Sequence, residues 1–177
     1  MPVSLNLIKQ GSMLLLLFSF LSLSAQKDIV PSSSVVISGQ VASEITISLE
    51  DLAAMPAVRI KDVTITNHLG EKRGKARKMK GVLLKNVFSQ ITLTSKMPKD
   101  LSELYLVCVA SDGYRVVFSW NELFNSDTGH HTFIVVEKDG KKLADMPDRI
   151  LLLTASDHMT GRRFVKGLSR IEVRRAE

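Results

Sequence analysis

Cysteine is nearly absent from the sequence, since Cys108 is the only one among 177 residues. One cysteine cannot form an internal disulfide, a zinc site built from cysteines or an iron–sulfur cluster. Aromatic residues amount to only 6% of the chain, which leaves few rings to stack on nucleic-acid bases. We therefore expect neither a disulfide scaffold, nor a cysteine-bound metal, nor a nucleic-acid partner.

Several catalytic motifs are also missing. The chain has no Gly-x-Ser-x-Gly sequence, no phosphate-binding glycine-rich loop and no dinucleotide fingerprint. The four histidines include no pair at the helical spacing of zinc ligands, and the neighbours His130 and His131 would point to opposite faces of a strand. Cys108 lies in the apolar run 104–110, where a free cysteine packs as a small hydrophobic side chain. No protein-bound metal and no nucleophilic cysteine are expected.

The N-terminus predicts a secretory signal peptide over residues 1–25. Lys9 precedes the apolar run 13–23, which is too short to span a membrane as a helix. Small residues follow the run, so cleavage is expected near Ala25, and an uncleaved N-terminal anchor is the alternative. The mature chain would then be exported, periplasmic or extracellular, without a transmembrane segment.

The rest of the chain has the composition of a globular protein, with 45% hydrophobic and 24% charged residues over the whole sequence. Residues 26–34 are expected to be a short lead-in and residues 35–177 one mixed, β-rich α+β domain. Strands are predicted at 35–39, 44–48, 57–66, 104–110, 115–119, 132–137, 142–143, 149–154 and 169–174, with a hairpin turn at Asp139 and Gly140. Helices are predicted at 49–55, where Ser48 is the expected cap, 81–90 and 120–124, whereas 67–80 and the surroundings of Met97 are expected to be loops. Short helices among many strands favour α+β over a doubly wound parallel sheet.

The net charge of +6 is distributed unevenly. Residues 71–80 carry six basic side chains against one acid, and residues 160–177 carry six against two. The remainder of the mature chain is acidic overall. Two solvated basic surfaces are one explanation, and a cluster that holds an anionic ligand through charge-assisted hydrogen bonds is the other.

Eight short segments, each weak as a motif by itself, become informative through their order and spacing. They are VVISGQV (35–41), SLEDL (48–52), KGVLL (80–84), ASDGY (110–114), FSWNEL (118–123), VVEKDGKKL (135–143), DRILLL (148–153) and GRRFVKGLSRIEV (161–173). This series resembles the molybdopterin-binding domain of the sulfite oxidase family over nearly the whole mature chain. The resemblance implies an α+β fold that binds a tricyclic pterin with a phosphate tail and a molybdenum ion.

The resemblance also implies which residues contact the cofactor. Three basic residues near the C-terminus would hold the phosphate, one arginine would line the site, and one aspartate would lie near the pterin. The three basic residues are Arg162, Arg163 and Lys166, the arginine is Arg149, and the aspartate is Asp112. Asn67 stands where the family has a molybdenum-ligating cysteine, and a neutral carboxamide cannot replace a soft thiolate.

The expected function is therefore to bind molybdopterin or another anionic small molecule, as an oxidoreductase subunit with a protein redox partner or as a degenerate member of the family. Redox chemistry would require that the pterin dithiolene hold molybdenum without a protein thiolate. A non-catalytic module that retains the fold and binds another ligand or a protein is the alternative. A third interpretation is a basic surface that adheres to anionic lipids.

Overall fold

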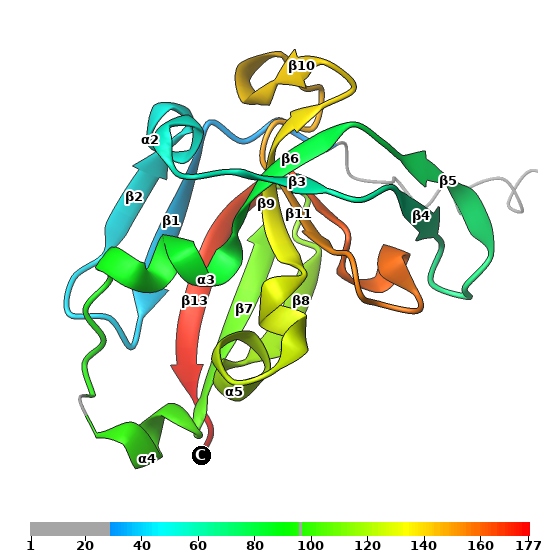
Figure 1. The fold of residues 1–177 in the computed structure, drawn as a ribbon. Coiled ribbons are helices and arrows are strands. Elements are labelled where there is room, and N and C mark those ends of the chain that lie inside the picture. Colours follow the sequence, from blue (N-terminus) through cyan, green and yellow to red (C-terminus); the bar gives the residue numbers. More distant parts are fainter. Residues whose placement is uncertain (1–28, 96) are drawn as a thin grey trace, which may run out of the picture.

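Two β-sheets and a two-stranded ribbon make up most of the structure, with short helices between the strands (Figure 1). The computed structural model describes residues 29–95 and 97–177, so the expected signal peptide lies outside the described residues. The fold is mixed α+β and mostly sheet, in one domain, as the sequence predicts. Among the described residues, no helix combines the length and the apolar character needed to cross a membrane.

The first sheet has five strands in the spatial order β2-β1-β13-β7-β8. They are β1 Ser34–Gly39, β2 Ile45–Ser48, β7 Leu104–Ala110, β8 Arg115–Ser119 and β13 Leu168–Arg175. β13 lies between β1, to which it is parallel, and β7, to which it is antiparallel. Six of the seven residues of β7 are buried, because both faces of this strand are covered, and this explains its near-continuous apolar sequence.

The second sheet has the order β12-β11-β9-β6-β3, and β10 pairs with β9. Its strands are β3 Val58–Ile60, β6 Met79–Leu83, β9 Thr132–Lys138, β10 Lys141–Lys142, β11 Leu151–Thr154 and β12 Val165–Lys166. All neighbours in this sheet are antiparallel. β9 and β10 form the hairpin that the pair Asp139 and Gly140 predicts, and both residues adopt the positive φ that such a turn requires.

A ribbon of β4 (Val63–Thr66) and β5 (Lys72–Ala76) extends beyond the second sheet. The prediction of a loop over residues 67–80 is therefore wrong, because β5 and the start of β6 lie there. Ala76 and Met79 are buried while their neighbours are exposed. The exposed positions carry lysine and arginine, so the sequence lacks the clear alternation of apolar and polar residues that predicts a strand.

Two further boundaries differ from the prediction. The expected strand 57–66 is divided into β3 and β4 at Lys61 and Asp62. The expected helix 81–90 begins only at Leu84, because Gly81 is still part of β6 and pairs with Val135.

The helices are all short. They are α2 Leu49–Ala54, α3 Leu84–Val87, α4 Pro98–Leu101 and α5 Trp120–Phe124, with 3-10 turns η1 Phe88–Gln90, η2 Asp127–His130, η3 Leu143–Asp145 and η4 Thr160–Arg163. α4 lies where the sequence predicts a polar loop, and a proline at its first position starts it. His130 and His131 belong to η2 and its end rather than to a strand.

α2 begins with the cap that the sequence predicts. The Ser48 hydroxyl accepts a hydrogen bond from the Asp51 amide (3.1 Å), and the Asp51 carboxylate accepts one from the Ser48 amide (2.9 Å). The hydrogen bonds that the Ser48 amide and the Ser48 hydroxyl donate to the Asp51 carboxylate hold the pKa of Asp51 below its usual value. The helix ends before Pro56, which cannot continue it.

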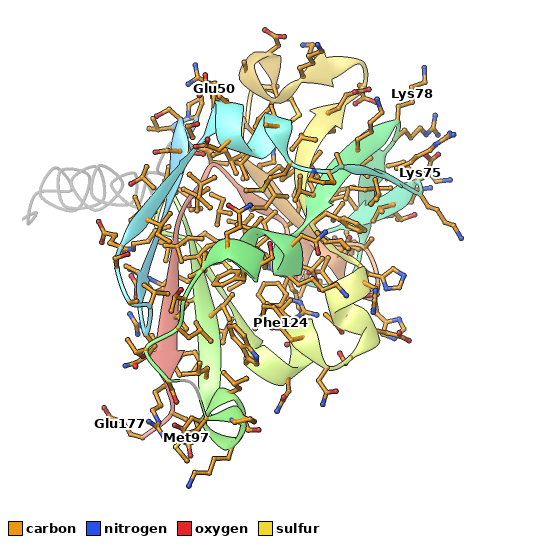
Figure 2. The ribbon with its side chains drawn as sticks, turned by 60° about the vertical axis from the view of Figure 1, so that its left-hand side comes forward. Glu50, Lys75, Lys78, Met97, Phe124 and Glu177 are labelled. Carbon is orange, nitrogen blue, oxygen red and sulfur yellow. The ribbon has the colours of Figure 1, made fainter. Side chains whose placement is uncertain are left out.

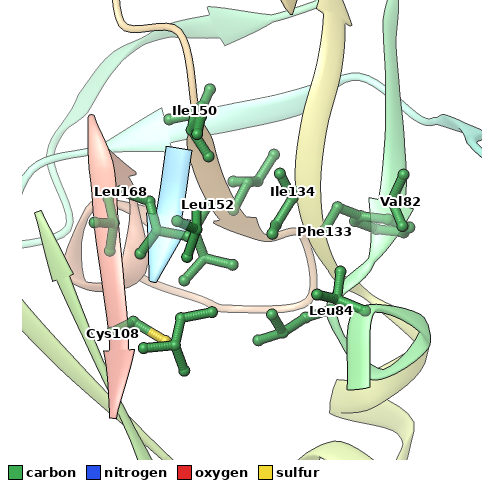
Figure 3. Packing of buried hydrophobic residues seen from close by; sticks show 14 of the residues in the cluster. Val82, Leu84, Cys108, Phe133, Ile134, Ile150, Leu152 and Leu168 are labelled. Atoms are coloured by element: carbon green, nitrogen blue, oxygen red, sulfur yellow. The ribbon is translucent and has the colours of Figure 1, made fainter. Parts of the chain in front are cut away.

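One apolar cluster lies between the two sheets and receives side chains from both (Figure 3). Ile134 and Leu152 reach it from the second sheet, whereas Cys108 and Leu168 reach it from the first. Leu84, at the start of α3, closes one side and is fully buried. Each fully buried side chain of this size contributes about 1.5–3 kcal/mol relative to exposure, so this layer is what holds the sheets together.

The end of β1 yields a first prediction. Gly39 has φ +93°, and a Cβ there would lie 2.1 Å from the carbonyl oxygen of Val173. Gly39→Ala should therefore lower the free energy of unfolding by about 2 kcal/mol or more, as measured by urea denaturation. Gly74→Ala is the matched control, since nothing lies within 4 Å of its Cβ position. Equal losses in the two variants would contradict this account.

Candidate anion-binding site

The predicted site residues lie on several turns that meet at one place in the fold. The central contact joins η4 to β4. The Thr160 hydroxyl donates to the carbonyl oxygen of Thr64 (2.7 Å) and accepts from the amide of Thr66 (3.0 Å), and the Gly161 amide donates to the Thr66 hydroxyl (3.3 Å). These hydrogen bonds fix Arg162 and Arg163, the next residues along the chain, beside the β4–β5 turn.

The absence of a side chain at Gly161 allows this close approach. A Cβ there would lie only 2.0 Å from the carbonyl oxygen of Thr66, so η4 packs directly on the backbone of the ribbon. The Arg162 guanidinium then donates from Nε to the carbonyl oxygen of His68 (3.0 Å), while its side chain stays exposed.

The β7–β8 turn joins the same group. The Tyr114 hydroxyl donates to the carbonyl oxygen of Arg162 (2.5 Å), and its ring centre lies 6.0 Å from that of His68. Asp112 holds the turn, because its Oδ1 accepts from the Tyr114 amide (2.8 Å). Burial, with a smaller effect from the Asp112 charge, raises the pKa of Tyr114, so the phenol stays protonated and continues to donate.

On its other side, the same turn reaches the junction of β12 and β13. The Ser111 amide donates to the carbonyl oxygen of Gly167 (2.8 Å), and the Gly167 amide donates to that of Asp148 (3.2 Å). Lys166 places its ammonium 3.5 Å from the Asp148 carboxylate, and its side chain is 41% exposed. This contact is long enough to leave the lysine's donors available to a ligand.

Arg149 lies next to this junction in an uncommon backbone conformation. Its φ is +43°, in the left-handed region, and its backbone forms a bridge with Ser32. Residues other than glycine persist in this region only where their surroundings hold them, and such positions gather at functional sites. Within the described residues, the Arg149 guanidinium has no ion-pair partner.

Two buried hydroxyls near these residues lack a hydrogen-bond partner in the part of the chain that the structure describes. They are Ser32 Oγ, beside Arg149, and Ser111 Oγ, beside Gly167. A buried polar atom without a partner is costly, so each hydroxyl has unused capacity for a polar group at this junction.

The side chain of Asn67 is occupied by hydrogen bonds within its own turn and is not available as a metal ligand. Its Oδ1 accepts from the amides of Leu69 (3.0 Å) and Glu71 (2.9 Å), and its Nδ2 donates to the Glu71 carboxylate (2.8 Å). The carbonyl oxygen and one N–H of the carboxamide are therefore used to shape the β4–β5 turn, and this turn-forming role accounts for an asparagine at the position.

Arg163 is engaged by carboxylates of its own chain. Its guanidinium binds both oxygens of Asp157, donates to Glu122 (2.5 Å) and lies 4.6 Å above the ring centre of Phe118. The hydrogen bonds that the guanidinium donates to Asp157, and to a lesser extent to Glu122, raise the pKa of Arg163 against the opposing effect of burial. Its donors are therefore directed into the protein, where they join η4 to α5.

The described residues offer no cluster of three or more His, Cys, Asp or Glu that could hold a metal ion. Cys108 is fully buried on β7, and burial raises its pKa to about 12. A thiol in this state is neither a metal ligand nor a nucleophile, so the expectation of a core cysteine is confirmed.

Several residues that organise this site were not predicted from the sequence. Tyr114, Thr160, Glu122 and Asp157 make the contacts described above, yet only Asp157 lies near its partner in the sequence. The Arg163–Glu122 pair spans 41 residues and the Tyr114–Arg162 pair spans 48, so no local pattern could have indicated either. The one local pattern in the sequence that indicated this site was Gly161 followed by two arginines.

Removing the Arg163 charge should destabilise the protein, because Asp157 and Glu122 would lose their common partner while partly buried. For Arg163→Met we expect a loss of about 1–3 kcal/mol in the free energy of unfolding, measured by urea denaturation. Arg174→Met is the control: Arg174 also pairs with a carboxylate, Glu172, but is 52% exposed, so the free energy of unfolding should stay nearly unchanged. Equal effects would contradict a structural role for Arg163.

The burial of Cys108 predicts its reactivity. In the native protein at pH 8, a water-soluble disulfide reagent should leave the thiol unmodified, because it is both inaccessible and protonated. The same reagent should label one thiol per chain after denaturation in urea. Rapid labelling of the native protein would show that β7 opens or that the cysteine is exposed.

No known protein family matches the sequence, and no curated protein is detectably similar to it. The fold is nevertheless similar to solved structures, among them the sulfane dehydrogenase SoxCD from Paracoccus pantotrophus, with a TM-score of 0.60 and 13% sequence identity. The superposition covers 84% of this chain and 39% of that chain. The chain thus spans less than half the length of this structural neighbour, and the likeness is one of fold.

Proposed function

We propose that this chain is an exported protein of the sulfite oxidase molybdopterin-binding fold, and that it binds an anionic, pterin-type ligand by its phosphate group. The observation that carries the proposal is the junction of β12 and β13. The Lys166 ammonium lies at it, the backbone of Arg149 follows Asp148 beside it, and the unpartnered hydroxyls of Ser32 and Ser111 are buried nearby. The fold likeness to a sulfane dehydrogenase and the resemblance of eight ordered segments to the family support the ligand class.

The chemistry of this junction suits a phosphate. A guanidinium offers up to five donors in a planar fork, an ammonium offers three, and both bind phosphate oxygens by charge-assisted hydrogen bonds. Arg162, exposed on η4, adds a third cation from the neighbouring turn. Asp112 and Asn67 support the site by shaping their turns rather than by direct contact.

A molybdenum ligated by the protein does not fit these residues. The Asn67 Oδ1 already accepts two hydrogen bonds, Cys108 is buried in the core, and thiolate is the ligand the family would require. Molybdenum, if present, would have to be held by the pterin dithiolene alone. When bound in that form the cofactor would supply the redox chemistry, and the protein residues would bind and orient its phosphate.

A second candidate is a non-catalytic module that keeps the fold and binds a different anion or a protein. The engagement of Arg163 by Asp157 and Glu122 favours it, because one of the three expected phosphate ligands is neutralised internally. A protein redox partner belongs only to the first candidate.

The two candidates are separated by expressing the full chain in a host that makes molybdenum cofactor. We expect the purified protein to carry a pterin, detected by the fluorescence of its oxidised form, and we would measure molybdenum by mass spectrometry. Arg149→Ala with Lys166→Ala should reduce the pterin content at least about tenfold, since each charge-assisted bond contributes about 1.5–3 kcal/mol.

The control for this experiment is Arg174→Ala with Lys99→Ala, which removes two cations at the end of the molecule that carries α4 and the C-terminus (Figure 1). Its pterin content should equal that of the unaltered protein. Protein that is folded yet free of pterin in a competent host would overturn the first candidate and leave the second.

A further inference from the structure

The basic side chains outside the candidate site are concentrated on one projecting element. We name residues 61–80 the basic arm; it comprises the ribbon β4–β5, the turn between these strands and the links to β3 and β6. The arm carries seven cations against two carboxylates. Figure 2 shows Lys75 and Lys78 at the edge of the molecule, on the side where the arm projects.

Most of this charge is not neutralised. The two arginines of the arm lie near carboxylates, Arg73 at 3.3 Å from Glu71 and Arg77 at 3.8 Å from Asp62, but all four side chains are more than half exposed. Exposed pairs of this kind contribute little and are screened by salt. Among the described residues, none forms an ion pair with the exposed lysines of the arm at 61, 72, 75 and 78.

Strand geometry places two of these lysines, Lys72 and Lys75, on the outer face of the ribbon. Val63 pairs with Ala76, and both are buried, so they mark the inner face of the ribbon. Lys75 pairs with Thr64 and therefore lies on the outer face. A register shift between Ile65 and Thr66 places an extra residue in β5, and the consecutive residues Lys72 and Arg73 are both exposed as a result.

The tip of the arm is apolar. Leu69, in the β4–β5 turn, is 77% exposed and is the most exposed large hydrophobic side chain among the described residues. Met159 extends the apolar surface, since its side chain lies beside Gly70 and is 37% exposed. The arm contains no Phe, Tyr or Trp.

We propose that the basic arm binds an anionic lipid surface, with Leu69 inserting between the headgroups and the exposed lysines along the arm contacting the lipid phosphates. An exposed apolar turn at one end of a ribbon that carries exposed cations along its length matches the two components of such a surface, the acyl boundary and the layer of negative charge. The aliphatic stems of lysine also allow the ammonium groups to stay at the headgroup level while the tip goes deeper.

Nucleic acid is a poorer fit to the same surface. Proteins that bind single strands without sequence preference stack bases on aromatic rings, and the arm offers none. An exposed leucine at the point of contact would remain unmatched on a phosphate backbone, whereas a lipid surface accommodates it.

The test is co-sedimentation of the full chain with vesicles of phosphatidylcholine, with and without phosphatidylglycerol. We expect binding only to the vesicles that contain phosphatidylglycerol, and we expect it to weaken as salt is added. Changing Lys72, Lys75 and Lys78 together to Gln should lower the partition coefficient about 10- to 100-fold, since each lysine near an anionic surface acts almost independently.

The matched control removes the same charge elsewhere, by changing Lys99, Arg174 and Arg175 to Gln near α4 and the C-terminus. It should bind the anionic vesicles nearly as well as the unaltered protein. Equal losses in the two triple variants would show a general charge effect and overturn the assignment to the arm. Binding to heparin without binding to anionic vesicles would overturn the lipid as partner.

Insertion of the tip is measured separately with Leu69→Trp. The fluorescence of this variant should shift to shorter wavelength on anionic vesicles and be quenched by brominated lipid, while the unaltered protein, which has only Trp120, should show neither change. Leu69→Ser should weaken binding without changing its salt dependence. Insertion is contradicted if the Leu69→Trp variant binds the vesicles while its added tryptophan keeps the emission wavelength of a solvent-exposed indole.

Discussion

Burial of one apolar layer between the two sheets is the constraint on which the rest of the structure depends. The chain must contribute strands to both faces of this layer, and after β12 it passes from the second sheet to the first within a single residue, Gly167. Leu168, next along the chain, is already fully buried. The tight passage brings Lys166 and the β7–β8 turn together, so the candidate site lies where the two sheets are joined.

Backbone groups do most of the positioning at this site. Carbonyl oxygens of Thr64, His68, Arg162 and Gly167 receive the hydrogen bonds that bind the turns to one another. A sequence can change its side chains widely and still keep such a frame, and this explains how a chain with 13% identity can share the fold of a much longer protein. The chemistry of the site is then decided by the few side chains that keep free donors, chiefly Arg149, and Lys166 beside its long contact with Asp148.

Sequence patterns predicted those elements whose signal is local. The apolar run of β7, the Asp-Gly hairpin of β9 and β10 and the Ser48 cap were all predicted correctly, because each depends on neighbouring residues. β5 was missed, since a solvated ribbon tolerates lysine and arginine at positions where a core strand has valine. The contacts of Arg163 were missed for a different reason: its partners are chosen by the tertiary fold, and the sequence alone pointed to a ligand instead.

The position of β13 at the centre of the first sheet has a consequence for folding. Val36 pairs with Arg170, so the two strands that meet there are separated by most of the domain. Such non-local pairing slows folding, because the entropy cost of closing the long intervening chain comes before the stabilising contacts between the two strands can form. A nascent chain therefore lacks the middle strand of its first sheet until residues 168–175 have left the ribosome. The first sheet can therefore be completed only after all of its other strands have been synthesised.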